Sequence, residues 1–309
     1  MSNGDPMKVD KIPDNVEKRT DNAGNEYYVG NFGDFDIPPF PIPHDYKTHA
    51  KEIRELELRD DDILVCSMAK SGWHWHSQII NMLLQKSTEY KESFSRFIDP
   101  GVRYITKGES TRVFMTHVPF EAIPKQALEK KVKVLILTRN PKDVCVSFYS
   151  HMSSHLGMLN YPGTFADFFD AMINENIFYG NIFEWFMGMQ KGFESNPDVP
   201  VMISNFEDMK EDSVRGVMKL NDFLGTDCSK ELCEKIAEAC EFSALKKVKM
   251  DNMPSQIKAI FKPGSSTFYR KGEVGDWKNW FTVAMNEHFD QECQKRMVGY
   301  KHQFRYTLD

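Results

Sequence analysis

Four strongly apolar segments alternate along the chain with segments of helical periodicity, and this alternation constrains the fold more than any other feature. The apolar segments are DILVC (62–66), RVFMTH (112–117), VKVLILTR (132–139) and PVMISNF (200–206). Each is apolar almost throughout, which is typical of strands buried on both faces of a parallel sheet. Helices are expected near residues 46–58, 72–86, 141–153, 165–175, 179–193, 208–224, 229–239 and 282–298. The alternation predicts an α/β fold with helices flanking a central, mostly parallel sheet.

The chain is expected to form one domain preceded by an N-terminal arm. Its 309 residues suffice for one large α/β domain or two small ones. Residues 1–45 contain many Pro, Gly, Asp and Asn residues, and DIPPFPIP (36–43) favours neither helix nor strand. We therefore predict an arm over residues 1–45, partly ordered across a pocket, and a single domain over residues 46–309.

Composition argues against several classes of protein. The net charge of −6 disfavours a nucleic-acid-binding protein, because affinity for the phosphate backbone requires a basic face. No apolar run approaches the roughly 20 residues that a membrane span requires, and the polar N-terminus lacks the apolar stretch of a signal peptide. The six cysteines form no CxxC pair and are expected to be reduced. We expect a cytoplasmic protein without nucleic-acid or membrane partners.

The first expected strand is followed by SMAKSGWHW, at the edge where ligands of parallel sheets bind. Lys70 can reach a phosphate and Gly72 allows close backbone approach, while the next helix offers unpaired N–H groups. The loop does not have the GxxxxGK[ST] pattern, which disfavours an ordinary ATPase or GTPase. Taken alone, it is either an anion site or a plain turn with a solvated lysine.

Two later segments carry further cations. Arg139 ends the third strand in LTRNPKDVCVSFYS, and Ser147 lies two helical turns later, where it can share a ligand with Arg139 or simply pack. YRKGEVGDWKNWFT places Arg270 and Lys271 beside Gly272. Adjacent cations beside a flexible glycine can bind a phosphate from several sides, and the planar guanidinium of arginine can donate two hydrogen bonds to it.

These segments and their order resemble the cytosolic sulfotransferase family, whose sulfuryl donor is 3'-phosphoadenosine 5'-phosphosulfate (PAPS). The resemblance runs from about residue 35 to the C-terminus, and RKGEVGDWKNWFT is highly specific for it. It implies a P-loop-like nucleotide-binding fold and an enzyme that sulfates a hydroxyl or amine of a small lipophilic acceptor, such as a phenol, steroid or alcohol. No metal is implied. His151 and His155 have helical spacing without an HExxH glutamate, which predicts a solvated helix end.

The resemblance also implies roles for the residues that match the family's motifs. His117, in MTHVPF, matches the catalytic base, and Lys70 would stabilise the leaving group. The residues implied to hold the donor are Lys70, Ser71, Gly72, Trp73 and His74 at the 5'-phosphosulfate, Arg139, Ser147, Arg270, Lys271 and Gly272 at the 3'-phosphate, and Trp75, Phe206 and Phe242 at the adenine. A homodimer is implied by a short motif matched at Lys278, Thr282, Val283 and Glu287.

Two departures from the family's pattern bear on catalysis. Met115 stands where the family has a lysine, and losing one preorganised charge typically costs about 10²–10³ in turnover. At Trp73 the family has a hydroxyl residue, and we expect the tryptophan amide to meet the phosphate while the ring points away. Two hypotheses therefore stay open: an active sulfotransferase, or a PAPS-binding homologue with weak or altered catalysis. An ATP-dependent kinase is disfavoured, because neither a Walker loop nor a Mg²⁺ carboxylate pair is evident.

The acceptor cannot be named from the sequence, but aromatic residues are available to surround it. Such residues more often pack in a core than line a pocket. The candidates are Phe32, Phe35, Phe40, Phe94, Phe97, Phe148 and Phe178.

Overall fold

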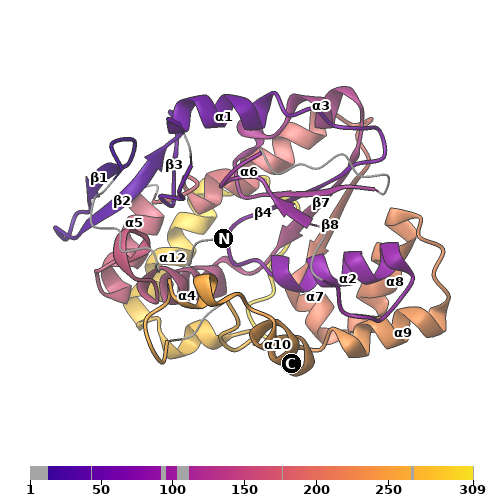
Figure 1. Cartoon of the computed structure of the whole chain (residues 1–309). Helices are drawn as coiled ribbons and strands as arrows, with labels where there is room; N and C mark the ends of the chain where they lie inside the picture. Colours follow the sequence, from indigo (N-terminus) through magenta and orange to yellow (C-terminus); the bar gives the residue numbers. More distant parts are fainter. Residues whose placement is uncertain are drawn as a thin grey trace.

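A five-stranded parallel sheet lies at the centre of the computed structural model (Figure 1), which describes residues 13–42, 44–91, 95–102, 111–175, 177–265 and 268–308. In spatial order the strands are β5 (Ser95–Phe97), β6 (Val113–Thr116), β4 (Ile63–Ser67), β7 (Lys133–Thr138) and β8 (Val201–Asn205). The α/β fold and the four strands expected from the apolar segments are confirmed. Strand β5 was not expected, because its three residues SRF carry no apolar run.

Each face of the sheet carries its own apolar core. Side chains alternate along a strand, so Leu64 and its partner Phe114 face one side, and Val65 and its partner Met115 face the other. The first core includes residues of α1 (Tyr46–Arg54), α3 (Lys125–Glu129), α4 (Pro141–Ser153), α5 (Phe165–Asn174), α6 (Ile182–Glu194) and α12 (Val283–Arg296). The second includes residues of α2 (Trp73–Gln85), α8 (Ser213–Leu224) and α9 (Lys230–Ala239). Figure 1 shows α1, α3 and α6 on one side of the sheet and α2, α8 and α9 on the other.

Most expected helices begin and end within a few residues of their predicted bounds. The expected helix over 208–224 is instead α7 (Phe206–Glu211) followed by α8. Asp212 between them leaves the helical region (φ −143°, ψ 85°), and its carboxylate caps α8 by accepting from the Arg215 N–H. Elements that were not expected are α3, α10 (Phe242–Asp251), α11 (Ser255–Lys258) and the 3₁₀ turns η1 (Phe120–Ala122), η2 (Gly157–Leu159) and η3 (Asp276–Asn279).

The described part of the N-terminal segment forms a three-stranded antiparallel sheet. Its strands, in spatial order, are β1 (Glu17–Thr20), β2 (Glu26–Asn31) and β3 (Asp36–Ile37). The prediction that residues 36–43 contain no strand is therefore wrong at the first two of them. The turn between β1 and β2 is stabilised by Asp21, whose Oδ1 accepts from the N–H groups of Ala23 and Asn25.

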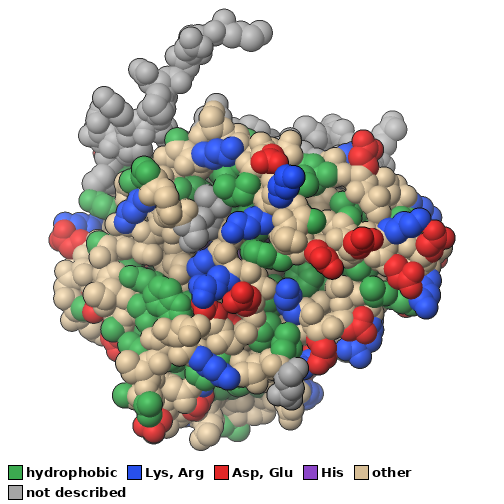
Figure 2. Space-filling model, turned by 90° about the horizontal axis from the view of Figure 1, so that it is seen from below, with side chains coloured by type: hydrophobic (Ala, Val, Ile, Leu, Met, Phe, Trp, Pro, Cys, Tyr) green, Lys and Arg blue, Asp and Glu red, His purple; other side chains and the backbone are tan. Residues whose placement is uncertain are grey.

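The surface mixes charges of both signs. On the face drawn in Figure 2, Lys and Arg side chains are interspersed with Asp and Glu, and hydrophobic patches lie between them. That face therefore carries no dominant basic surface. Among the described residues, no helix combines the length and apolar character needed to cross a membrane. The six cysteines are free thiols, as expected.

Candidate active site

The loop between β4 and α2 has the backbone geometry of an anion-binding turn. Lys70 (φ +71°) and Gly72 (φ +97°) both adopt left-handed conformations, and Gly72 caps α2. The first N–H groups of a helix lack intrahelical partners and attract negative charge. The hydroxyl of Ser71 is buried and has no hydrogen-bond partner among the described residues. This loop can therefore offer both backbone and side-chain donors to a phosphate or sulfate.

Three cations lie at this loop, Lys70, Arg139 and Arg270, and only the two arginines pair with buried carboxylates of the described chain, Arg139 with Asp143 at 3.9 Å and Arg270 with Asp276 at 2.5 Å. The Lys70 carbonyl accepts a hydrogen bond from Arg139 Nη1 at 3.1 Å. Burial, helped by the charges of Arg139 and Arg270, lowers the pKa of Lys70 to about 7. Within the described chain, no carboxylate forms an ion pair with the Lys70 ammonium group. An anion bound here would relieve the repulsion between these cations.

Arg139 lies between the loop that joins β4 to α2 and the loop that precedes the last helix. Its Nη2 donates to the carbonyl of Glu273 at 3.0 Å, and its guanidinium carbon lies 4.4 Å from the ring centroid of Phe206. Its Nε is buried and has no partner among the described atoms. Ser147 is buried two turns into α4, the helix that begins just after Arg139. The arrangement keeps a guanidinium donor available in the site.

Two buried carboxylates that the sequence analysis did not single out position the glycine-rich loop. Asp143 on α4 accepts from the N–H groups of Gly275 at 2.7 Å and Trp277 at 2.9 Å. Asp276 accepts from Arg270 Nη1 at 2.5 Å and Lys271 Nζ at 2.6 Å. The pKa of Asp276 is lowered, because hydrogen bonds from these cations and Asn279 outweigh the opposing effect of burial.

The sequence does not mark either carboxylate. Asp143 lies in the first turn of α4, where an aspartate is common because it interacts favourably with the helix dipole. Asp276 begins the short 3₁₀ turn η3, which has no periodic pattern. The Nε of Arg270 stays buried and without a partner in the described chain. It can therefore still donate to a phosphate while Asp276 holds the guanidinium.

The residues expected at the adenine lie close to the two glycines of the site. Phe206 packs edge-on against Trp75 at 5.5 Å between ring centroids. A Cβ on Gly72 would lie 2.7 Å from the Phe206 ring, and a Cβ on Gly272 would lie 2.2 Å from the Phe242 ring. Both glycines are therefore required by close packing as well as by positive φ.

His117 is held in one tautomer and one orientation. Its Nδ1 lies 2.7 Å from the carbonyl oxygen of Ser67, which only accepts, so Nδ1 carries the proton and Nε2 is the basic nitrogen. Its backbone N–H donates to Asp99 at 3.0 Å. Burial lowers the pKa of His117 to about 4, and Lys70 acts in the same direction while the Ser67 bond opposes it. The imidazole is therefore neutral at pH 7 and able to accept a proton.

Aromatic rings surround this imidazole. Phe97 and Tyr179 lie 5.0 and 5.3 Å from the His117 ring, and Phe40 lies 5.8 Å from Phe97. The Trp73 ring packs 5.4 Å from Phe97, so it lies on the same side as the base. That its amide meets a phosphate while the ring points away stays a prediction.

The other candidate aromatics do not pack directly on this imidazole. Phe32 and Phe35 line a hollow of about 670 Å³ beside α1 and α6, which adjoins the base because Tyr179 also lines it. Phe148 and Phe178 belong to the buried core, and Phe94 lies outside the described residues.

The prediction of a solvated helix end at His151 and His155 is wrong. The two rings lie 4.5 Å apart and pack against Phe261, and His155 is 4% exposed. The reason is a long-range contact, since His155 forms a β-bridge with Phe261 that covers the end of α4. Burial lowers the pKa of His151, His155 and His74. These neutral imidazoles, together with Phe268, lie near Lys70.

Met115 is fully buried in β6 and belongs to the apolar core on the α2 side of the sheet. The site consequently has no cation at this position. The cations that could face an anion here are Lys70, Arg139 and Arg270.

A sulfotransferase domain model matches residues 60–301 of the chain. Sulfotransferase 1E1 of Bos taurus is 34% identical over 294 residues, covering 91% of this chain and 97% of that protein. Sulfotransferase 1A1 of Bos taurus is 33% identical over 269 residues, covering 83% and 90%.

Solved structures with this architecture include a mouse sulfotransferase complexed with PAP and a retinol dehydratase complexed with androsterone and PAP. The mouse protein gives a TM-score of 0.68 at 25% identity, covering 82% of this chain and 90% of that one. The retinol dehydratase gives a TM-score of 0.74 at 19% identity, covering 95% of this chain and 99% of that one. At this identity the likeness establishes a shared fold only. From its sequence and its family match, the chain belongs to the cytosolic sulfotransferase family and is a PAPS-dependent sulfotransferase.

Proposed function

We propose that this enzyme moves the sulfuryl group of PAPS to a hydroxyl, or an amine, of a small lipophilic acceptor such as a phenol, steroid or alcohol. The observation that carries the proposal is the neutral His117, whose Nε2 is free to take a proton between the rings of Phe97 and Tyr179. Its surroundings of aromatic rings and uncharged imidazoles favour an apolar, uncharged acceptor. The structure of a retinol dehydratase with androsterone supports an acceptor of this size class on the same fold.

The donor is proposed to bind along the cations of the site. Three buried donors without a hydrogen-bond partner among the described residues support this assignment: the Ser71 hydroxyl, Arg139 Nε and Arg270 Nε. The PAP bound to the mouse sulfotransferase supports the same class of ligand. The full proposed set is Lys70, Ser71, Gly72, Trp73 and His74 at the 5'-phosphosulfate, Arg139, Ser147, Arg270, Lys271 and Gly272 at the 3'-phosphate, and Trp75, Phe206 and Phe242 at the adenine.

The proposed reaction uses two side chains, His117 as the base and Lys70 at the leaving group. Nε2 of His117 takes the proton of the acceptor hydroxyl as its oxygen forms the new bond to sulfur. The bond from sulfur to the 5'-phosphate oxygen breaks in line, and Lys70 neutralises the charge left on that oxygen. The Ser67 carbonyl stabilises the imidazolium that forms, because it accepts from Nδ1.

The N-terminal arm over residues 1–45 is proposed to complete the acceptor pocket. Phe40, which precedes α1, packs against Phe97 beside the base. The arm therefore supplies at least one ring close to the acceptor side of the site. Removing it should broaden acceptor choice or weaken acceptor binding. We place the reaction in the cytoplasm, in keeping with the family.

A homodimer is proposed through the segment that begins α12. Lys278, Thr282, Val283 and Glu287 are all exposed, and Val283 is 75% exposed despite being apolar. A short motif of this kind predicts a small interface that dissociates on dilution.

Buried Met115 supports a second candidate, a PAPS-binding protein with weak catalysis. The two functions are separated by following labelled sulfate from PAPS to a panel of phenols, sterols, alcohols and amines. Transfer well above that of His117→Ala supports the active enzyme. Tight PAP binding without transfer above that background would leave only the second candidate.

A further inference from the structure

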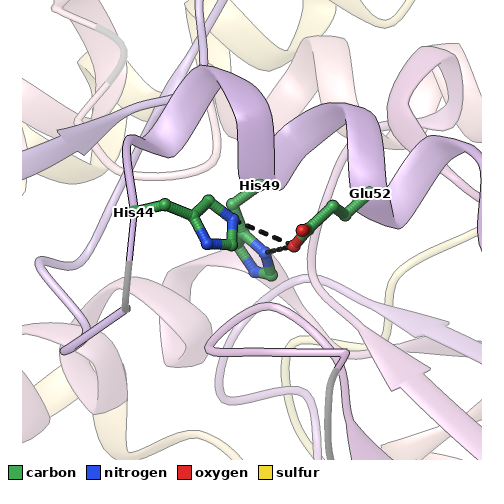
Figure 3. A group of neighbouring side chains, drawn as sticks. All are labelled: His44, His49 and Glu52. Carbon is green, nitrogen blue, oxygen red and sulfur yellow. Dashed lines mark hydrogen bonds and ion pairs between the residues drawn. The ribbon is translucent and has the colours of Figure 1, made fainter.

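Two histidines and a glutamate converge at α1, apart from the residues proposed to hold the donor (Figure 3). His44 precedes the helix, and His49 and Glu52 lie three residues apart on one face of it. Glu52 Oε2 lies 2.9 Å from Nε2 of His44 and 3.3 Å from Nδ1 of His49. Figure 3 shows both imidazoles turned toward this carboxylate, and the three ligand atoms lie within 4.8 Å of one another.

The hydrogen bonds of His49 determine which of its nitrogens carries the hydrogen. Nε2 lies 2.8 Å from the backbone carbonyl oxygen of Asp99, which only accepts, so Nε2 is the donor. In the neutral ring, Nδ1 then points a lone pair at Glu52 Oε2, which is also an acceptor. Two acceptors at this distance repel each other unless a proton or a metal cation lies between them.

The spacing and exposure of the three side chains suit a metal cation. A tetrahedral ion with bonds of about 2.0–2.1 Å to nitrogen and oxygen has ligand–ligand edges of roughly 3.3 Å. The separation of His49 Nδ1 and Glu52 Oε2 is 3.3 Å, whereas that of His44 Nε2 and Glu52 Oε2 is 2.9 Å and would lengthen slightly around an ion. The His49 side chain is 1% exposed, whereas those of His44 and Glu52 are 18% and 32% exposed. An ion can therefore enter from solvent and retain a water molecule as its fourth ligand.

We propose that His44, His49 and Glu52 bind one divalent ion of the zinc class. Imidazole and carboxylate ligands suit this class, and the bond from His49 to the Asp99 carbonyl is the kind of outer contact that orients a metal-bound imidazole. The Asp99 carboxylate in turn accepts from the backbone N–H of His117. The ion would brace the segment before α1 against the strand end that carries His117. This inference does not depend on the proposed acceptor or on sulfuryl transfer.

The test uses the full-length protein, freed of metal with a chelator and titrated with ZnCl₂ by calorimetry. We expect one site per chain and a zinc-dependent rise in Tm, since an ion that binds only the folded state stabilises it. Glu52→Gln and His44→Gln should each weaken zinc affinity by at least about tenfold and abolish the rise in Tm. The matched controls Glu57→Gln and His302→Gln change exposed residues outside the cluster and should bind zinc like the parent.

Cobalt substitution provides a second readout that does not depend on stability. Co²⁺ at this site should give visible absorption of a tetrahedral ion without the near-ultraviolet band of a thiolate ligand, and Glu52→Gln should lose it. Equal zinc affinity in the parent and in both cluster variants would overturn the proposal, because the ion would then sit on other ligands. The absence of stoichiometric zinc binding would also overturn it.

Discussion

Nδ1 of His117 lies 2.7 Å from the backbone carbonyl oxygen of Ser67, the last residue of β4. His117 directly follows β6, and β4 and β6 are neighbouring parallel strands, so the sheet itself holds this pair in register. The bond leaves Nε2 as the only nitrogen of His117 that can take a proton. Orientation of the proposed base is thus a consequence of strand pairing.

Replacing this base should reduce turnover without removing donor binding. We expect His117→Gln to lower kcat by about 10²–10⁴-fold, the usual contribution of a positioned general base. PAP affinity, measured by calorimetry, should stay close to that of the parent, because the proposed phosphate contacts come from other residues. His302→Gln, at an exposed position, is the control. A His117→Gln enzyme with parental kcat would exclude the proposed role.

The pKa of Lys70 predicts a loss of donor capture at alkaline pH. Its folded pKa is lowered from 10.5 to about 7 by burial, Arg139 and Arg270, so its charge disappears as pH rises through that value. We expect kcat/KM for PAPS, which reports the free enzyme, to fall above about pH 7. The fall in kcat should come at higher pH, because bound phosphates favour the charged amine. Lys70→Arg stays charged, and persistence of the same fall in kcat/KM in this variant would contradict the assignment.

Two glycines with similar backbone angles provide a matched pair of variants. Gly272 and Gly264 have φ of +68° and +74°, but of the two a Cβ would meet a neighbour among the described residues only at Gly272, where the Phe242 ring would lie 2.2 Å away. Both alanine variants should carry about 1–2 kcal/mol of backbone strain. Gly272→Ala should in addition displace Phe242 and raise the Kd for PAP by about tenfold or more. Equal PAP affinities in the two variants, measured by calorimetry, would argue against a role of this packing in donor binding.

Met115 is predicted to serve packing rather than catalysis. It is fully buried in an apolar core, so Met115→Lys should place an unpaired charge there at a cost of several kcal/mol. We expect Tm to fall by roughly 10 °C and turnover not to rise. Met115→Leu keeps the volume and should change neither quantity much. Thermal denaturation measures Tm, and the sulfate-transfer assay measures turnover. A Met115→Lys enzyme with higher turnover and parental Tm would contradict the packing role and show that the side chain at this position reaches the transferred group.

The exposed valines allow a direct test of the proposed dimer. Val283 and Val298 are both 75% exposed, but only Val283 lies in the segment that matches the dimerisation motif. We expect Val283→Glu to convert a dimer to a monomer in sedimentation at micromolar concentration, because a buried charge at a small interface is costly. Val298→Glu should leave the dimer intact. A parent that sediments as a monomer at the same concentration would rule the dimer out.

Strands β4, β6 and β7 could be predicted because continuous apolar runs report burial on both faces. Strand β8 was found by the same pattern although it is an edge strand that is only partly buried. The cations that lie together at the β4–α2 loop could be singled out because they follow strands or lie in short, distinctive loops, and their binding role stays a prediction. The separation of α7 from α8 and the strand at Asp36–Ile37 could not, since each depends on one hydrogen-bonding arrangement rather than on periodicity.

The sequence by itself determined the α/β sheet, the strand–loop–helix unit at β4 and the segments that resemble a sulfotransferase, because periodicity and short motifs are local properties. Only the tertiary structure decided that Asp143 and Asp276 hold the glycine-rich loop, that His151 and His155 are buried, and which nitrogen of His117 is basic. Apart from the bonds of Asp276 to Arg270 and Lys271, which are local, these features join segments far apart along the chain. Which residues contact one another across these segments depends on how the helices pack against the sheet, and no local sequence pattern encodes that packing.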